Sequence, residues 1–276
     1  MASKQWTLLC SLLLLLAGHS ARAEETVYRV GIVPQLEARK LHAIWQPILD
    51  ELTVATGHAF TIVGERDIPA FEKAFAAGDY DFVYLNPWHA VIAWELQGYT
   101  PIVKDASREL KGVLVVPENS AINEIRDLEG AEIAFPAPNA FGASLLMRAD
   151  LKFLHGIDIT PVYVDTHTSV YLNVVLGTTA AGGGILSTLN EQAPIVREQL
   201  RILYSTRASS PHPISAHPRV DPAVVARVTD ALLAMAGDAE SQALLERIPI
   251  NGIGRATLAE YLVLRDWGLR DFYAGK

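Results

Sequence analysis

Three short apolar segments of this chain each run into polar residues that favour the start of a helix. The segments and the residues after them are Asp81–Leu85 with Asn86–His89, Glu132–Phe135 with Asn139–Gly142, and Val162–Val164 with Asp165–Ser169. Asn and Thr are favoured helix N-caps, and Pro87 suits a first helical position. Each junction would leave free backbone N–H groups and a positive helix dipole at the carboxyl end of a strand, where α/β proteins bind small anions. Because the pattern occurs three times, it predicts a ligand crevice.

The chain alternates strand and helix patterns around these junctions. Before Lys111 the order is β-α-β-α-β-α, which predicts a doubly wound parallel sheet, and a second α/β unit follows. A crossing is expected after the strand Lys111–Val116, and the Pro-rich stretch Ser209–Pro213 is expected to return the chain to the first unit. The predicted fold is therefore α/β, with two doubly wound lobes joined by a two-crossing hinge. Lobe 1 comprises residues 24–116 and 209–276, closed by helices that pack back on it, and lobe 2 comprises residues 117–208.

Residues 1–23 have the features of a cleaved signal peptide. Lys4 precedes the apolar run Leu8–Ala17, and Ala21-Arg22-Ala23 is an A-x-A cleavage site. The run is too short for a transmembrane helix, which takes about 20 residues. We therefore expect a secreted protein whose mature chain begins at residue 24.

Removal of this leader changes the charge and the cysteine content. It takes away Lys4 and Arg22 from 23 basic residues and none of 31 acidic residues, so the balance becomes 21 against 31, or −10. It also removes the only cysteine, Cys10, which excludes a disulfide, a thiolate metal site and a cysteine nucleophile. The acidic balance argues against nucleic acid or an anionic membrane surface as a partner.

The first two junctions offer asparagine and backbone N–H groups to a ligand. At the first, Asn86 would donate to an anion while Trp88 or His89 lines the cleft; the alternative is a plain N-cap with Trp88 buried against a neighbouring helix. At the second, Asn139 and the backbone of Ala140 and Phe141 would contact the ligand. The alternative there is a capped helix start.

The third junction offers His167 and Thr168. The helix dipole disfavours a charged imidazole at a helix N-terminus, so a neutral His167 would donate one N–H to an oxyanion. His212 and His217 flank the return crossing and, with His89 and His167, leave a metal site open as a minor alternative. Gly182–Gly184 matches no phosphate-binding loop and is expected to admit a ligand or another strand close to its backbone.

These features together resemble the phosphate/phosphite/phosphonate-binding family of periplasmic solute-binding proteins of ABC importers, which have the type II periplasmic binding protein fold. The segments that carry the resemblance are Gly31–Pro34, Gly78–Pro87, Asn139–Ser144, Thr166–Ser169 and Val174–Gly177. The resemblance implies that the cleft holds a small oxyanion, that His167 contacts it, and that the closed form docks on a membrane permease.

The sequence departs from phosphonate binders at three places. Asn139–Gly142 lacks the hydroxyl side chains of the family's loop before the second-lobe helix. Thr178–Gly184 lacks the acidic residue that would meet a ligand amine, and His212 stands where another acidic contact is expected. The resemblance therefore implies an oxyanion other than an aminoalkylphosphonate, or a small organic acid.

We therefore predict a monomeric periplasmic solute-binding protein for an ABC importer, without a cofactor, a metal or catalytic residues. The alternatives are a ligand-sensing partner of a membrane sensor kinase and, with less support, a His-lined metal-binding protein or enzyme. The predicted ligand-binding residues are Tyr84, Asn86, Trp88, His89, Asn139, Ala140, Phe141, His167, Thr168 and His212.

Overall fold

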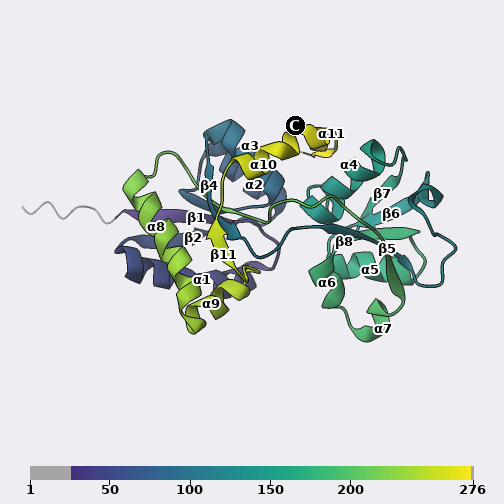
Figure 1. Cartoon of the computed structure of the whole chain (residues 1–276), viewed down its shortest axis with the longest axis horizontal. Helices are drawn as coiled ribbons and strands as arrows, with labels where there is room; N and C mark the ends of the chain where they lie inside the picture. The colour runs from purple at the N-terminus through teal and green to yellow at the C-terminus, as the bar shows by residue number, and fades with distance from the viewer. Residues whose placement is uncertain (1–25, 275–276) are drawn as a thin grey trace, which may run out of the picture.

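The computed structural model describes residues 26–274, which form two lobes, each with a sheet between layers of helices (Figure 1). The predicted signal peptide lies outside the described residues. Within residues 26–274, no helix combines the length and the apolar composition that crossing a membrane requires.

Lobe 1 is built on a six-stranded sheet with the order β11-β4-β10-β3-β1-β2. Its strands are β1 (Val27–Ile32), β2 (Ala59–Val63), β3 (Phe82–Tyr84), β4 (Thr100–Asp105), β10 (Ile214–Ala216) and β11 (Ile253–Arg255). β1, β2 and β3 are parallel, as the alternating pattern predicts, whereas β10 runs antiparallel to β3 and β4 and makes the sheet mixed.

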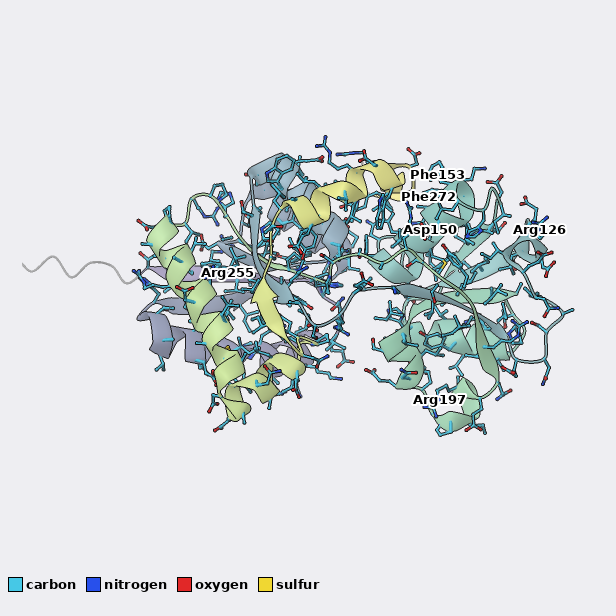
Figure 2. The ribbon with its side chains drawn as sticks, viewed as in Figure 1. Arg126, Asp150, Phe153, Arg197, Arg255 and Phe272 are labelled. Carbon is cyan, nitrogen blue, oxygen red and sulfur yellow. The ribbon has the colours of Figure 1, made fainter. Side chains whose placement is uncertain are left out.

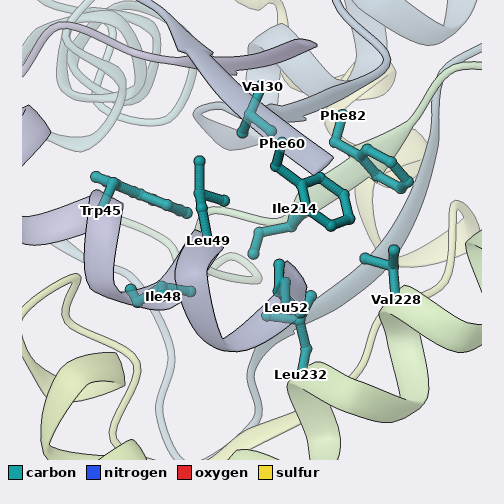
Figure 3. A pocket seen from close by; sticks show the side chains of 10 residues that line it. All are labelled: Val30, Trp45, Ile48, Leu49, Leu52, Phe60, Phe82, Ile214, Val228 and Leu232. Atoms are coloured by element: carbon teal, nitrogen blue, oxygen red, sulfur yellow. The ribbon is translucent and has the colours of Figure 1, made fainter. Parts of the chain in front are cut away.

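Two groups of helices cover this sheet. Helix α1 (Ala38–Thr56) packs with α8 (Pro222–Ala234) and α9 (Ala239–Glu246), the last two linked by the 3₁₀ turn Met235–Gly237. Helix α2 (Ile68–Ala77) packs with α3 (Pro87–Gln97), and α10 (Ala259–Leu262) covers α3. An apolar cavity of about 20 Å³ lies among the core side chains of α1, the sheet and α8 (Figure 3). It offers no polar group to a ligand and is little larger than one water molecule.

Lobe 2 is built on a five-stranded sheet with the order β7-β6-β8-β5-β9. Its strands are β5 (Gly112–Pro117), β6 (Glu132–Phe135), β7 (Thr160–Tyr163), β8 (Ala181–Ile185) and β9 (Leu200–Ser205). Its helices are the 3₁₀ turn η1 (Ile125–Leu128), the π turn η2 (Phe141–Leu145) that continues into α4 (Leu146–Phe153), α5 (His167–Val175), α6 (Leu186–Asn190) and α7 (Pro194–Arg197).

The first crossing lies earlier in the chain than the sequence suggested. β4 ends at Asp105 in the sheet of lobe 1, and β5 already belongs to the sheet of lobe 2, so residues 106–111 cross. Residues 112–116 therefore belong to lobe 2 rather than to lobe 1, because a strand pattern does not specify which sheet the strand joins. The return crossing occupies residues 206–213, and Leu110 and Ser209 exchange two backbone hydrogen bonds between the crossings.

The three glycines of β8 admit helices rather than a ligand or another strand. A Cβ atom on Gly183 would collide with the carbonyl oxygen of Ala143 in η2, and one on Gly184 would collide with the hydroxyl of Tyr171 in α5. The missing side chains therefore let η2 and α5 rest directly on the strand.

The C-terminal elements begin on lobe 1, as predicted, but do not end there. Tyr261, Leu264 and Leu269 are buried in the core of lobe 1. After α10, the chain forms the 3₁₀ turn η4 (Val263–Trp267) and then α11 (Leu269–Phe272), which contacts α4 of lobe 2. Figure 1 shows this last segment lying over the boundary between the lobes.

Candidate ligand-binding site between the lobes

Helix α3 begins at the boundary between the lobes as its sequence predicts. Asn86 has an extended backbone, its side-chain oxygen accepts a hydrogen bond from the backbone N–H of His89 at 2.8 Å, and Pro87 occupies the first helical position. The Asn86 side chain is buried, and its Nδ2 donates to the carbonyl oxygen of Asn139 in lobe 2 at 3.4 Å. The N-terminus of α3 thus points at the loop before η2.

Asn139 does not cap the helix that it precedes. Ala140 holds the N-cap position of η2 without a side-chain hydrogen bond. The Asn139 amide instead pairs with the backbone of Ala274: its Nδ2 donates to the Ala274 carbonyl at 2.6 Å, and its Oδ1 accepts from the Ala274 N–H at 2.9 Å. Nδ2 also lies 2.8 Å from Oε1 of Glu72. We call this meeting of Asn86, Asn139, Glu72, Tyr273 and Ala274 the Asn139 junction.

Glu72 is a site residue that the sequence does not reveal. It lies within α2, and its Oε1 accepts hydrogen bonds from Nε2 of His89 at 2.9 Å and from Asn139. Burial, followed by the charge of Glu72 and a hydrogen bond to it, raises the pKa of the Tyr273 hydroxyl. Nothing in the local sequence marks Glu72, because its partners come from α3, from lobe 2 and from the C-terminal segment.

Trp88 and His89 do not line an open cleft in this structure. Both side chains are completely buried. The Trp88 ring lies against Tyr273, with the Arg270 guanidinium 5.6 Å from its centroid, and His89 packs against Phe75, Phe71 and Tyr273. The alternative of a buried Trp88 therefore describes its position better. The His89 ring contacts the Asn139 junction through Glu72 and Tyr273, and its backbone N–H through Asn86.

A buried cation lies beneath the Asn139 loop. Arg148 on α4 is 8% exposed, and no carboxylate pairs with it among residues 26–274. Its guanidinium donates to the carbonyl oxygens of Pro138 at 2.7 Å and Phe272 at 3.0 Å, and to the Ser144 hydroxyl. Burial lowers the pKa of Arg148 from its ordinary value. An uncompensated positive charge at this depth favours a nearby anion.

At the third junction, one ring nitrogen of a histidine has no hydrogen-bond partner within the described residues. Thr166 caps α5 by accepting from the backbone N–H of Ser169 at 3.0 Å, as the sequence predicts. His167 follows as the first helical residue, and its Nδ1 is buried without a hydrogen-bond partner. Burial lowers the pKa of His167 to about 4, so the ring is neutral at pH 7. Asp165 turns the chain into the helix with a φ of 68°, and Thr168 is exposed. We call Asp165–Thr168 the His167 junction.

Tyr84 and His212 form a second imidazole-containing cluster on lobe 1. Their rings stack with centroids 5.5 Å apart, and the Tyr84 hydroxyl donates to the carbonyl oxygen of Ile248 at 3.4 Å. Burial, together with His89 and Arg108, lowers the pKa of His212 to about 3. Its neutral Nε2 therefore accepts from the Gln35 amide nitrogen at 3.0 Å.

The remaining predicted residues separate into those at the boundary and those away from it. Ala140 precedes η2, and Phe141 is buried with side chains of the lobe 1 core, which closes part of the boundary with apolar surface. His217 follows β10, at the opposite end from His212, and does not join it. Among residues 26–274, no group of three or more His, Cys, Asp and Glu side chains is arranged to hold a metal ion.

Comparison with known proteins supports the same architecture. Residues 30–261 match the family described as "ABC transporter, phosphonate, periplasmic substrate-binding protein". PhnD1 from Prochlorococcus marinus, solved with methylphosphonate, superposes with a TM-score of 0.76 at 16% identity, over 88% of this chain and 97% of that one. A Xanthomonas citri protein solved with a chloride ion superposes with a TM-score of 0.78 at 18% identity, over 90% of this chain and 99% of that one. A phosphonate transporter binding protein from Pseudomonas aeruginosa superposes with a TM-score of 0.74 at 13% identity, over 88% of this chain and 86% of that one. These neighbours share the type II periplasmic binding protein fold.

Proposed function

Because this chain belongs to the family of periplasmic substrate-binding proteins of ABC phosphonate transporters, we propose that it binds a small oxyanion between its lobes and presents it to a membrane permease. Proteins of this family are transport receptors rather than enzymes, and the proposal includes no covalent step. The ligand is held and released unchanged.

The observation that carries the proposal is the meeting of two helix starts across the lobe boundary. Asn86 at the start of α3 contacts Asn139 before η2, so the two helix starts lie at one place. At α3 the donor left free within the described residues is the N–H of Trp88, because Pro87 has no N–H and the His89 N–H is bonded to Asn86. Helix N-termini stabilise negative charge through these donors and the helix dipole. The buried guanidinium of Arg148 beneath the same loop adds to that potential.

The neutral imidazole of His167 supports an anion that is held by hydrogen bonds rather than by ion pairs. A neutral ring donates through one nitrogen, and the buried Nδ1 has no partner within the described residues. The carboxylate of Glu72 lies beside Asn139 and disfavours a densely charged ligand. We therefore propose a small anion of low charge, such as a monoanionic phosphonate, phosphite or organic acid.

Calorimetric titration of the full chain tests this proposal. Methylphosphonate, phosphite, phosphate and acetate are titrated separately, and any binding compound is recovered and identified by mass spectrometry. We expect saturable one-to-one binding of at least one of them, with the compound returned unchanged. Binding of none of the four would refute the proposal, and a chemically altered compound would indicate an enzyme instead.

A further inference from the structure

The C-terminal residues Trp267–Ala274, which we call the strap, contact both lobes. The strap comes after the two crossings that already join the lobes. It continues from α10 and η4, which have side chains buried in the core of lobe 1. It therefore makes a third connection at the boundary, one that can break without breaking the chain.

The strap is held to lobe 1 by polar and aromatic contacts. Arg270 forms an ion pair with Glu95 on α3, and its guanidinium lies over Trp88. The ring of Tyr273 packs edge-on against His89, and the charge of Glu72 adds to burial in raising the pKa of the Tyr273 hydroxyl.

The strap is held to lobe 2 along α4. Figure 2 shows Phe272 beside Phe153, and their rings meet edge-on at a centroid distance of 5.9 Å. The Arg148 guanidinium lies 5.4 Å from the Phe272 centroid. Arg148 also donates to the Phe272 carbonyl oxygen. At the end of the strap, the Ala274 backbone pairs with the Asn139 amide.

The start of the strap is shaped for this contact. Gly268 has a φ of 73°, and a Cβ atom there would collide with the Phe153 ring, so both its backbone and its neighbour require glycine. Just before it, Trp267 lies under the Arg207 guanidinium, 4.3 Å from the ring centroid. Arg207 belongs to the return crossing and pairs with the buried Asp150 of α4 at 2.7 Å. The strap, the hinge and lobe 2 thus share one network.

We propose that the strap holds the two lobes in the arrangement of this structure, which we call closed, before any ligand binds. Opening the lobes would separate Phe272 from Phe153 and Arg148, and Ala274 from Asn139, unless the strap gave up its contacts with lobe 1 instead. The buried Arg148 would then lose the carbonyl and the ring that cover it, which opposes opening. The inference concerns the protein without ligand and is independent of which anion it binds.

Spin labels on the two lobes measure this arrangement directly. Val54→Cys on α1 and Leu176→Cys after α5 place labels at side chains that are 87% and 76% exposed, in a Cys10→Ser background that removes the only native thiol. Dialysed protein gives the interlobe distance distribution by double electron–electron resonance. We expect one narrow distribution for the otherwise unaltered chain.

Phe272→Ala removes the aromatic and cation–π contacts of the strap with lobe 2. We expect a longer and broader distribution, with the ratio of closed to open protein reduced about tenfold by loss of the aromatic and cation–π contacts. Val263→Ala, a half-exposed position in η4, is the matched control and should leave the distribution unchanged.

Arg270→Ala provides a second variant in case Phe272→Ala folds poorly, as checked by circular dichroism. Arg270 is half-exposed and tethers the strap to lobe 1 from the surface. We expect Arg270→Ala to lengthen and broaden the interlobe distance distribution as well, by a smaller amount. Distributions that stay narrow and unshifted in the folded variants would overturn the proposal.

Discussion

The Asn139 junction and the His167 junction both lie where a strand leads into a helix, but their polar side chains differ in whether they are already hydrogen-bonded. At the first, both amide functions of Asn139 and the carboxylate of Glu72 are bonded within the protein. At the second, a buried imidazole nitrogen has no partner among the described residues. A group that is already bonded contributes to stability, and a ligand that uses it must replace its partner. An unpartnered group contributes little to stability and gains a bond when a ligand arrives. The comparison assigns interlobe cohesion to the side chains of the Asn139 junction, and it adds the His167 imidazole to the helix N–H groups as a polar group that is free for the ligand.

The largest expected effect is the loss of stability in Glu72→Ala. The change leaves the buried His89 ring N–H without its acceptor and removes one of the two acceptors of the Asn139 amide, which should lower the free energy of unfolding by about 3 kcal/mol. Urea unfolding measures this loss in the free energy of unfolding. Lys73→Ala, an exposed change on the same helix, is the control and should stay within about 0.5 kcal/mol of the parent. A cost below about 1 kcal/mol for Glu72→Ala would mean that the junction does not hold the lobes.

His167→Ala should have the converse effect. Loss of a hydrogen bond to a charged ligand corresponds to about a tenfold to hundredfold loss of affinity, while the free energy of unfolding should change by less than about 1 kcal/mol. Calorimetry with a ligand identified as above, together with urea unfolding, separates the two quantities. His155→Ala, an exposed histidine of lobe 2, should change neither. If His167→Ala binds as tightly as the parent, the His167 junction is not the recognition site.

The low pKa of His167 predicts a pH dependence of stability. Burial places this pKa at about 4 in the folded protein, against an ordinary value of 6.5, so the unfolded chain takes up the proton first as the pH falls. The contribution is therefore fully present above pH 6.5 and is lost towards pH 4, by about 1 kcal/mol after allowing for the partial exposure of the ring. Urea unfolding across this range should show a smaller decline for His167→Gln than for the parent. Parallel curves would mean that the ring is not kept neutral by burial.

The helix starts could be predicted from sequence because their signals are local. Asn86 and Thr166 cap α3 and α5 by bonding the N–H three residues later. Asn139 carries the same signal but bonds Glu72, 67 residues before it, and Ala274, 135 residues after it. Nothing near Asn139 in the sequence announces either partner.

The same limit explains the displaced crossing and the unpredicted strap. The apolar run in Gly112–Pro117 predicts a strand, but membership of the sheet depends on pairing with β8 and β9, which lie far along the chain. The apolar spacing of residues 257–267 predicts helices that cover lobe 1, and Tyr261 and Leu264 do so. The turn onto lobe 2 depends on Gly268 and on the position of Phe153, which only the folded chain brings together.

The smallest expected effect is the difference in stability between two variants, one without the N-cap of α3 and one without the N-cap of α5. Thr166→Ala removes a cap and an exposed hydrogen bond to the Ser169 hydroxyl, and it should lower the free energy of unfolding by about 1 kcal/mol. Asn86→Ala removes an equivalent cap and also the donor to the Asn139 carbonyl, so it should cost about 0.5 kcal/mol more. Urea unfolding of both variants gives the difference, and the equal position of the two caps in their helices makes each the control for the other. Because the Asn86 contact to Asn139 is long at 3.4 Å, the excess should stay small. Equal costs would mean that the Asn139 junction is held by Glu72 and the strap alone, with Asn86 acting only on its own helix.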